Sequence, residues 1–234
     1  MTQRILYIAT LIGLFATFSL NAQETQPNEK NAEKIRGSRF IPYPNYPGSS
    51  FLNSKFLLGE IEFTDGSKVS RVGINYGTYR DELIYYNTTI STQIVIDKSS
   101  LKGFSFTDKN GDKRIFRRQF FNGYFHDDCF FEVLSDGKIS LLAYRKVSLE
   151  ACDTYNSKSG MAFTPAYSYY LYESGKGYIP VNCSRNSLLS KFSKPNIKLI
   201  KKTLRKNGVF ISDETSFVNA WNLIAELNVE PVFN

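Results

Sequence analysis

The chain has 234 residues and a formal net charge of +7, with 19 Phe and 15 Tyr against one Trp and one His. This length suggests one domain or two small ones, with ample material for a core. The aromatic content favours strands, because Tyr and Phe suit a half-buried pleated surface. The three cysteines are widely spaced and there is a single histidine, which does not match the spacing of a zinc site, so we expect no metal and no cofactor.

Residues 1–22 have the pattern of a signal peptide. Arg4 provides a positive start, residues 5–20 are apolar, and small residues lead up to Ala22, after which we expect cleavage. The apolar run is short for a membrane span. No cysteine follows it, so we do not expect a lipoprotein. We therefore expect a periplasmic or secreted protein that keeps a charge of +6 once Arg4 is removed.

Residues 23–47 are expected to form a disordered or extended leader. The stretch 23–36 is polar and rich in charge, with little to bury. The stretch 37–50 carries three prolines among aromatic residues, and we expect it to lie extended against the domain that follows.

Residues 48–183 are expected to form an antiparallel β domain. Turn signals at Asp65-Gly66, Asn110-Gly111, Asn122-Gly123 and Asp136-Gly137 separate runs of alternating apolar residues, a pattern typical of hairpins. The expected strands are residues 55–63, 68–76, 83–86, 92–96, 101–107, 114–121, 124–134, 138–147, 162–173 and 178–182, with a polar loop at 148–160.

The strand at 162–173 is rich in tyrosine. Alternation places Tyr167 and Tyr169 on one face and Tyr170 and Tyr172 on the other. Either pair could stack on a sugar or a base, but a tyrosine-rich strand is more often half-buried sheet surface.

Residues 184–234 are expected to form a helical hairpin packed on the β domain. Asn186 is a candidate cap for a short first helix, Pro195 fits the first turn of the second, and Gly208 ends it. Ser212 or Asp213 caps the last helix. Its expected inner face consists of Phe217, Trp221, Ile224 and either Leu227 or Asn228. The predicted fold is thus mainly β (α+β): an antiparallel meander sheet, curled or sandwich-like, with a C-terminal helical hairpin.

The second of these helices has a basic face opposite an apolar stripe. One interpretation is a patch for an anionic partner, either an envelope protein, a glycan or a lipid surface. The other, which we favour from sequence alone, is the solvated side of an amphipathic helix with lysines near its C-terminus. Nucleic acid is not expected as a partner of an exported protein. The face consists of Lys198, Lys201, Lys202, Arg205 and Lys206.

A catalytic site would be sought first around the only histidine, His126, which precedes Asp127, Asp128 and Cys129. In a strand, His126 and Cys129 point to opposite faces, so a Cys-His pair is geometrically poor. We predict no catalytic residue and no enzyme, although two carboxylates distant in sequence would leave no local pattern.

The pairing of the cysteines is open from the sequence. In an oxidising compartment Cys152 and Cys183 are the likelier disulfide, with Cys129 left as a buried strand residue.

Three sequence patterns resemble a group of exported, uncharacterised proteins of Bacteroidetes-type bacteria. They are GSxFLNxxFxxGxIxFxDG at residues 48–66, GYF…FEVLSDGKISLLAYRKV at 123–147, and YYLYxxGKGYIPV leading into the basic helical hairpin. The resemblance implies a secreted or periplasmic domain and brings no catalytic residues with it.

These observations favour an exported, non-enzymatic binding or envelope-associated module. The alternatives are a hydrolase of envelope polymers that uses two distant carboxylates, and a carrier of a hydrophobic ligand.

Overall fold

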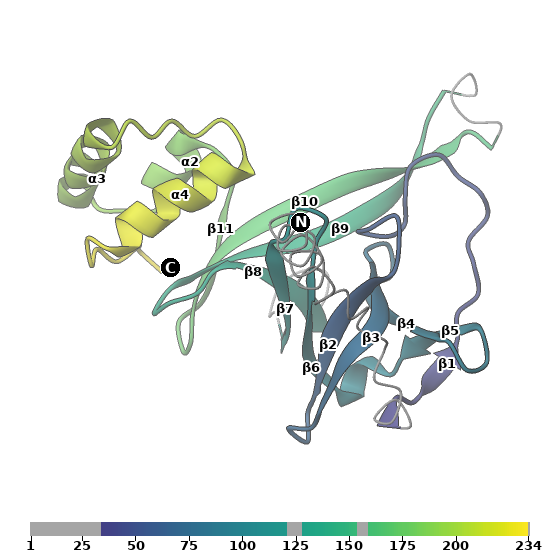
Figure 1. Ribbon diagram of the computed structural model, residues 1–234. Coiled ribbons are helices and arrows are strands. Elements are labelled where there is room, and N and C mark those ends of the chain that lie inside the picture. Colours follow the sequence, from purple (N-terminus) through teal and green to yellow (C-terminus); the bar gives the residue numbers. More distant parts are fainter. Residues whose placement is uncertain (1–33, 121–127, 154–158, 234) are drawn as a thin grey trace, which may run out of the picture.

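The structure is a computed structural model that describes residues 34–120, 128–153 and 159–233. Within them the chain forms one antiparallel sheet of eleven strands that does not close on itself, followed by three α-helices, which confirms the predicted fold (Figure 1). The strands are β1 (Gly37–Arg39), β2 (Leu57–Phe63), β3 (Lys68–Gly77), β4 (Glu82–Asn87), β5 (Thr92–Ile96), β6 (Leu101–Thr107), β7 (Lys113–Phe120), β8 (Asp128–Ser135), β9 (Ser140–Ala151), β10 (Met161–Glu173) and β11 (Gly177–Val181).

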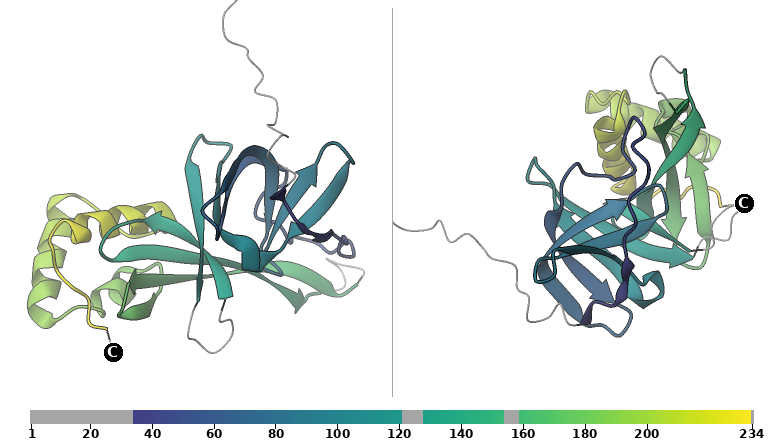
Figure 2. Two further views of the ribbon diagram at one scale, coloured as in Figure 1. Left: turned by 90° about the horizontal axis from the view of Figure 1, so that it is seen from below. Right: turned by 90° about the vertical axis from the view of Figure 1, so that its right-hand side faces the viewer.

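The strand order is β1-β5-β4-β3-β2-β6-β7-β8-β9-β10-β11. It departs from a simple meander where β2 pairs with β6, which puts β3, β4, β5 and β1 on one side of β2 and the remaining strands on the other. The first seven strands curl tightly, while β9 and β10 form a long hairpin that runs from this curled part to the helices (Figures 1 and 2). The protein is therefore elongated, with the helices at one end.

Two of the predicted turns have the backbone that their sequences require. Gly66 and Gly111 adopt φ of +81° and +89°, a region that glycine enters without steric cost. In the second turn the Asp108 carboxylate accepts hydrogen bonds from the backbone N–H groups of Asn110 (2.8 Å) and Asp112 (3.1 Å). The Asn122-Gly123 turn lies outside the described residues.

The predicted loop at residues 148–160 is wrong at its near end, because β9 continues to Ala151. Leu149 stands opposite Phe163 in the β9–β10 ladder, and the buried Phe163 ring packs edge-on against Tyr43 and Tyr46. The segment before β2 thus covers the hairpin as expected. Part of the predicted leader belongs to the sheet, because residues 37–39 form β1 and pair with β5.

Two apolar clusters lie on the same side of β8. The first core fills the curled part and includes Phe116 and Phe130. The second core lies between the β8–β11 strands and the helices, where Leu141 and Leu171 meet Phe217 and other helix residues. The curled part and the helical part are therefore stabilised by separate cores that share one sheet.

The helices are α2 (Arg185–Leu189), α3 (Lys194–Lys206) and α4 (Glu214–Ala225). Ser184 caps α2, in place of the predicted Asn186, and Asp213 caps α4 in a reciprocal capping box with Ser216. Pro195 lies in the first turn of α3, and Gly208 follows its end at φ +64°. Phe217, Trp221 and Ile224 are buried as predicted. Within the described parts of the chain, no helix is both long and apolar enough to cross a lipid bilayer.

Candidate functional site

The segment around the only histidine offers no catalytic pair in the residues that can be placed. His126 and Asp127 lie outside the described residues. Asp128 begins β8 and is held by Arg118, with Nε–Oδ1 at 2.7 Å and Nη2–Oδ2 at 3.0 Å. Cys129 is 2% exposed, and burial raises the pKa of its thiol to about 11. A protonated, buried thiol is a poor nucleophile.

The three cysteines are free in this structure, so the predicted Cys152–Cys183 disulfide is not formed. The ladder register explains why. Cys152 follows the end of β9, which pairs with Met161, whereas Cys183 follows Val181, which pairs with Tyr169. Eight residues of strand separate these positions along β10, or about 26 Å, and a disulfide needs Cα atoms within about 7 Å.

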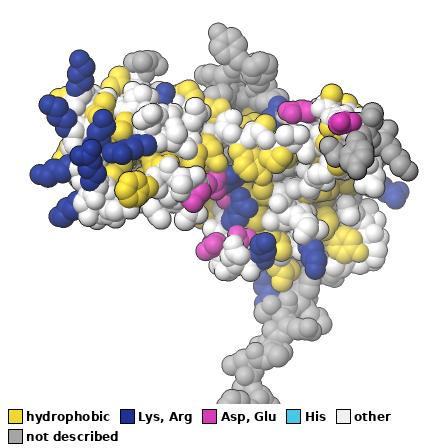
Figure 3. All heavy atoms as spheres, turned by 90° about the horizontal axis from the view of Figure 1, so that it is seen from above, with side chains coloured by type: hydrophobic (Ala, Val, Ile, Leu, Met, Phe, Trp, Pro, Cys, Tyr) yellow, Lys and Arg dark blue, Asp and Glu magenta, His cyan; other side chains and the backbone are white. Residues whose placement is uncertain are grey.

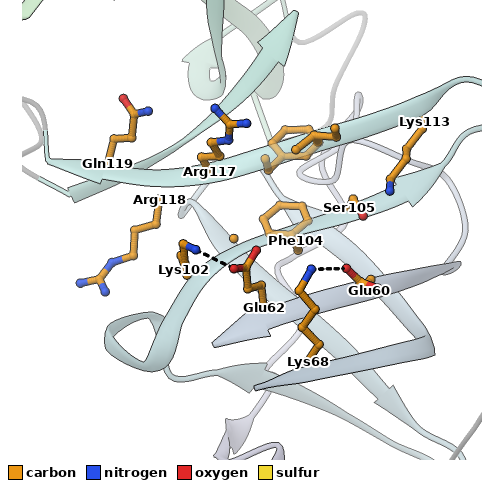
Figure 4. A pocket seen from close by; sticks show the side chains of 13 residues that line it. Glu60, Glu62, Lys68, Lys102, Phe104, Ser105, Lys113, Arg117, Arg118 and Gln119 are labelled. Atoms are coloured by element: carbon orange, nitrogen blue, oxygen red, sulfur yellow. Dashed lines mark hydrogen bonds and ion pairs between the residues drawn. The ribbon is translucent and has the colours of Figure 1, made fainter. Parts of the chain in front are cut away.

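A groove of about 500 Å³ crosses the outer face of β2, β6 and β7, and acidic and basic side chains line it (Figure 4). Glu60 accepts from Lys68 at 3.1 Å, and Glu62 accepts from Lys102 at 2.7 Å. Hydrogen bonds from Ser70 and Lys68 lower the pKa of Glu60, and the hydrogen bond from Lys102 lowers the pKa of Glu62. A glycosidase acid needs the opposite shift, so these two carboxylates do not suit general acid catalysis.

A chain of ion pairs, buried at its centre, joins the sheet to α4, and we did not predict it from the sequence. Arg145 is 3% exposed and Glu132 is 4% exposed. Arg145 Nε lies 2.5 Å from Glu132 Oε2, while its other nitrogens bind both oxygens of Glu214 on α4. Arg114 binds Glu132 from β7, and the Tyr169 hydroxyl donates to Glu214 at 2.8 Å. This network ties four strands, β7 to β10, to α4.

Three of the four predicted tyrosines of β10 are packed on the two faces of the sheet, while Tyr167 is 41% exposed with the Arg145 guanidinium over its ring. Tyr169 faces the helices and packs edge-on against Phe217. Tyr170 and Tyr172 lie on the other face, where both rings contact Tyr178. They form half-buried sheet surface, which is the interpretation that we favoured.

The basic face of α3 is the clearest exposed feature of the described residues. All five predicted residues are exposed, and Lys194 joins them on the same side. At about 100° per residue, these six cations span an arc of about 140°, opposite the buried Ile200 and Leu204. Figure 3 shows dark blue side chains gathered at the helical end of the molecule, with the magenta acidic groups placed away from it.

The segment that contains α3 carries the whole net charge of the protein. Residues 184–212 contain eight Lys and Arg and no Asp or Glu. The rest of the chain has 21 Lys and Arg against 22 Asp and Glu, which is close to neutral. Among the described residues, no ion pair involves a cation of α3. In the β part of the molecule, by contrast, seven cations contact acids: Lys68, Lys98, Lys102, Arg114, Arg117, Arg118 and Arg145.

The spacing of these cations is unfavourable for the helix itself. Lys198 and Lys202 are four residues apart, as are Lys201 and Arg205, and each such like-charged pair destabilises an isolated helix by about 0.2–0.5 kcal/mol. Only Arg205 and Lys206, in the last turn, benefit from the helix dipole. The dipole therefore does not account for the remaining cations of α3.

Comparisons with protein-family models, with curated proteins and with solved structures found no match to this chain. The resemblance to exported proteins of Bacteroidetes-type bacteria therefore stays a prediction. Within the described residues, no group of three His, Cys, Asp or Glu side chains could hold a metal ion. The basic face of α3 is the candidate site that we develop below.

Proposed function

We propose that the protein is an exported, non-enzymatic binding module of the cell envelope, and that it attaches to an anionic partner through the basic face of α3. The observation that carries this proposal is the contrast in charge pairing. Six exposed cations share one side of a 13-residue helix without an acid beside them, while the sheet pairs many of its charges.

The way α3 is held also supports a binding role. Ile200 and Leu204 anchor its inner side in the second core, so the outer side is presented on a fixed scaffold. Binding through such a face does not need the helix to fold or to reorient. The cations are then arranged before the partner arrives, which lowers the entropic cost of association.

The proposal implies attachment that depends on salt. Exposed charges interact over a Debye length of about 10 Å at 0.1 M salt and over about 3 Å at 1 M. Binding should therefore be strong at low salt and weaken steadily as salt is added.

A matched pair of charge-reversed variants tests the proposal. In the first, Lys198, Lys201 and Lys202 are changed to Glu. In the control, Lys55, Lys109 and Lys113 are changed to Glu, because these lysines are exposed, lie on the β part of the molecule and give the same change in net charge. Affinity is measured on a sulfated-polysaccharide resin and on vesicles with anionic lipid, over a range of salt.

The α3 variant should lose about 100-fold or more in affinity for at least one of the two probes, since each cation near an anionic surface contributes about 1 kcal/mol. The control should lose less than about tenfold on that probe. Equal losses in both variants would mean that only net charge matters, and the proposal would be wrong.

A further inference from the structure

We infer that the anionic partner of α3 is the surface of a lipid bilayer with anionic head groups. This inference rests on the proposed function and narrows its partner to one class. It draws on the apolar side chains beside the cations, on the shape of the surface, and on the kind of cation that α3 uses.

Two large apolar side chains are exposed in the segment that carries the basic face, one on α3 and one just after it. Leu199 is 44% exposed and Phe210 is 75% exposed. On the helix, Leu199 lies at the edge of the cationic arc beside Lys202 and Lys206, and Phe210 follows two residues after Gly208. Cations that meet head groups, together with Leu and Phe side chains that enter the boundary of the acyl region, are the features by which amphipathic surfaces bind membranes.

This apolar pair is separate from the packing of the helix. The apolar stripe of α3 is already used, because Ile200 and Leu204 are buried in the second core. Leu199 and Phe210 belong to neither of the two cores. They are thus free to contact a partner while α3 stays docked.

The basic face is an outward-facing helix surface rather than a groove. Figure 1 places α3 at the extreme end of the molecule, and the charged groove described above lies on β2, β6 and β7. A projecting helix suits an extended flat partner, whereas a polymer chain held specifically would need walls to contact it.

The choice of cation supports a diffuse partner as well. Five of the six cations are lysines and one is arginine. Arginine recognises sulfate, phosphate and carboxylate groups through a fixed bidentate geometry, whereas lysine acts as a mobile point charge. A row of lysines fits a fluid surface whose head groups rearrange around the protein.

The test separates charge from insertion. The wild-type chain, the variant Leu199→Ser/Phe210→Ser and a control variant Ile41→Ser/Ile90→Ser are compared, because Ile41 and Ile90 are 76% and 61% exposed on the β part. Binding is measured by co-sedimentation with phosphatidylcholine vesicles, with or without about a third phosphatidylglycerol, and by retention on the sulfated-polysaccharide resin. Circular dichroism and the fluorescence of Trp221, the only tryptophan, confirm that each variant is folded.

The inference predicts that the Leu199/Phe210 variant binds the anionic vesicles about tenfold more weakly than wild type and binds the resin unchanged. The control variant should match wild type on both. Two results would overturn the lipid assignment and leave the proposed function standing. One is that the Leu199/Phe210 variant binds the anionic vesicles as well as wild type does, and the other is that wild type binds the resin alone. If wild type bound neither the anionic vesicles nor the resin, both the proposed function and the lipid assignment would be wrong.

Discussion

The outer face of the β2–β7 strands and the outer face of α3 are both rich in Lys and Arg, but their cations are in different surroundings. On the strands, Lys68 and Lys102 lie within hydrogen-bonding distance of Glu60 and Glu62. On α3, the cations lie next to one another and no acid is present on the helix. A cation that is paired within the protein is largely neutralised, so the unpaired face is where an outside anion gains most.

The same contrast extends into the interior. Arg145 is the most deeply buried cation among the ion pairs described above, and two acids surround it. Its charge serves to join the sheet to α4. Net charge alone does not show where a protein binds, and the pairing of each charge is the more informative property.

The largest expected effect is from Arg145→Met. Removing the guanidinium leaves the buried Glu132 with Arg114 as its one remaining cation and takes the cation from the partly buried Glu214. Because breaking a fully buried pair costs about 3–5 kcal/mol, we expect a loss of about 3 kcal/mol. Urea unfolding followed by Trp221 fluorescence measures the loss. Lys201→Met, the same change on α3, should stay within about 0.5 kcal/mol of wild type. Similar losses in the two variants would remove the distinction between the regions.

A smaller effect is expected from Glu214→Gln, at about 1.5 kcal/mol at pH 7, because a charge-assisted hydrogen bond to Arg145 becomes a neutral one. Burial raises the pKa of Glu214, but the hydrogen bond and charge of Arg145 outweigh it and hold that pKa below its ordinary value.

The lowered pKa of Glu214 determines how the difference in stability between wild type and Glu214→Gln depends on pH. A lowered pKa in the folded state means that the stabilisation by Glu214 is present above the unfolded pKa of about 4.3 and is lost as the pH falls through the folded pKa. The gap between wild type and Glu214→Gln should narrow below about pH 4.3. A gap that widens there would contradict the assignment of the ion pair.

One substitution made at two positions gives a sharper contrast. Lys102→Glu places a second acid beside Glu62 and should destabilise the protein by about 1 kcal/mol. Lys202→Glu places an acid between Lys198 and Lys206, so it should stabilise the protein slightly while weakening attachment to the anionic partner.

The smallest predicted effect is this gain from Lys202→Glu, about 0.5 kcal/mol from two repaired pairs, or about 1–2 °C in melting temperature. Thermal unfolding at low salt measures it, and the gain should disappear at about 1 M salt. A loss of stability at low salt would mean that α3 is not under the repulsion that we describe.

Much of the fold could be predicted because local signals agree with the final structure. The turns at Gly66 and Gly111 need a positive φ, which the Asp-Gly and Asn-Gly pairs in the sequence predict. The end of β9 could not be predicted in this way, because Ser148 and Glu150 look like loop residues until Phe163 is placed opposite Leu149. Partners from distant segments decide such a boundary.

The candidate site could be predicted only in part from the sequence. Helical periodicity placed Lys198 and its neighbours on one face, but the absence of nearby acids depends on the tertiary fold. Part of the buried network had a signal in the sequence that we missed. Glu132 lies on the same face of its strand as the buried Phe130, and Arg145 lies on the same face of the next strand as the buried Leu141. Inward charges of opposite sign on neighbouring strands predict a buried pair. The third member, Glu214, lies 69 residues from Arg145 and leaves no such pattern.

The placement of the charged segment at one end of an elongated, otherwise nearly neutral molecule gives the protein a large permanent dipole (Figures 1 and 3). An anionic surface exerts a torque on such a dipole and turns the molecule before contact is made. With the anionic partner that we propose, the protein would arrive with α3 foremost. The edge strand β1, at the other end of the molecule, would then point away from that surface.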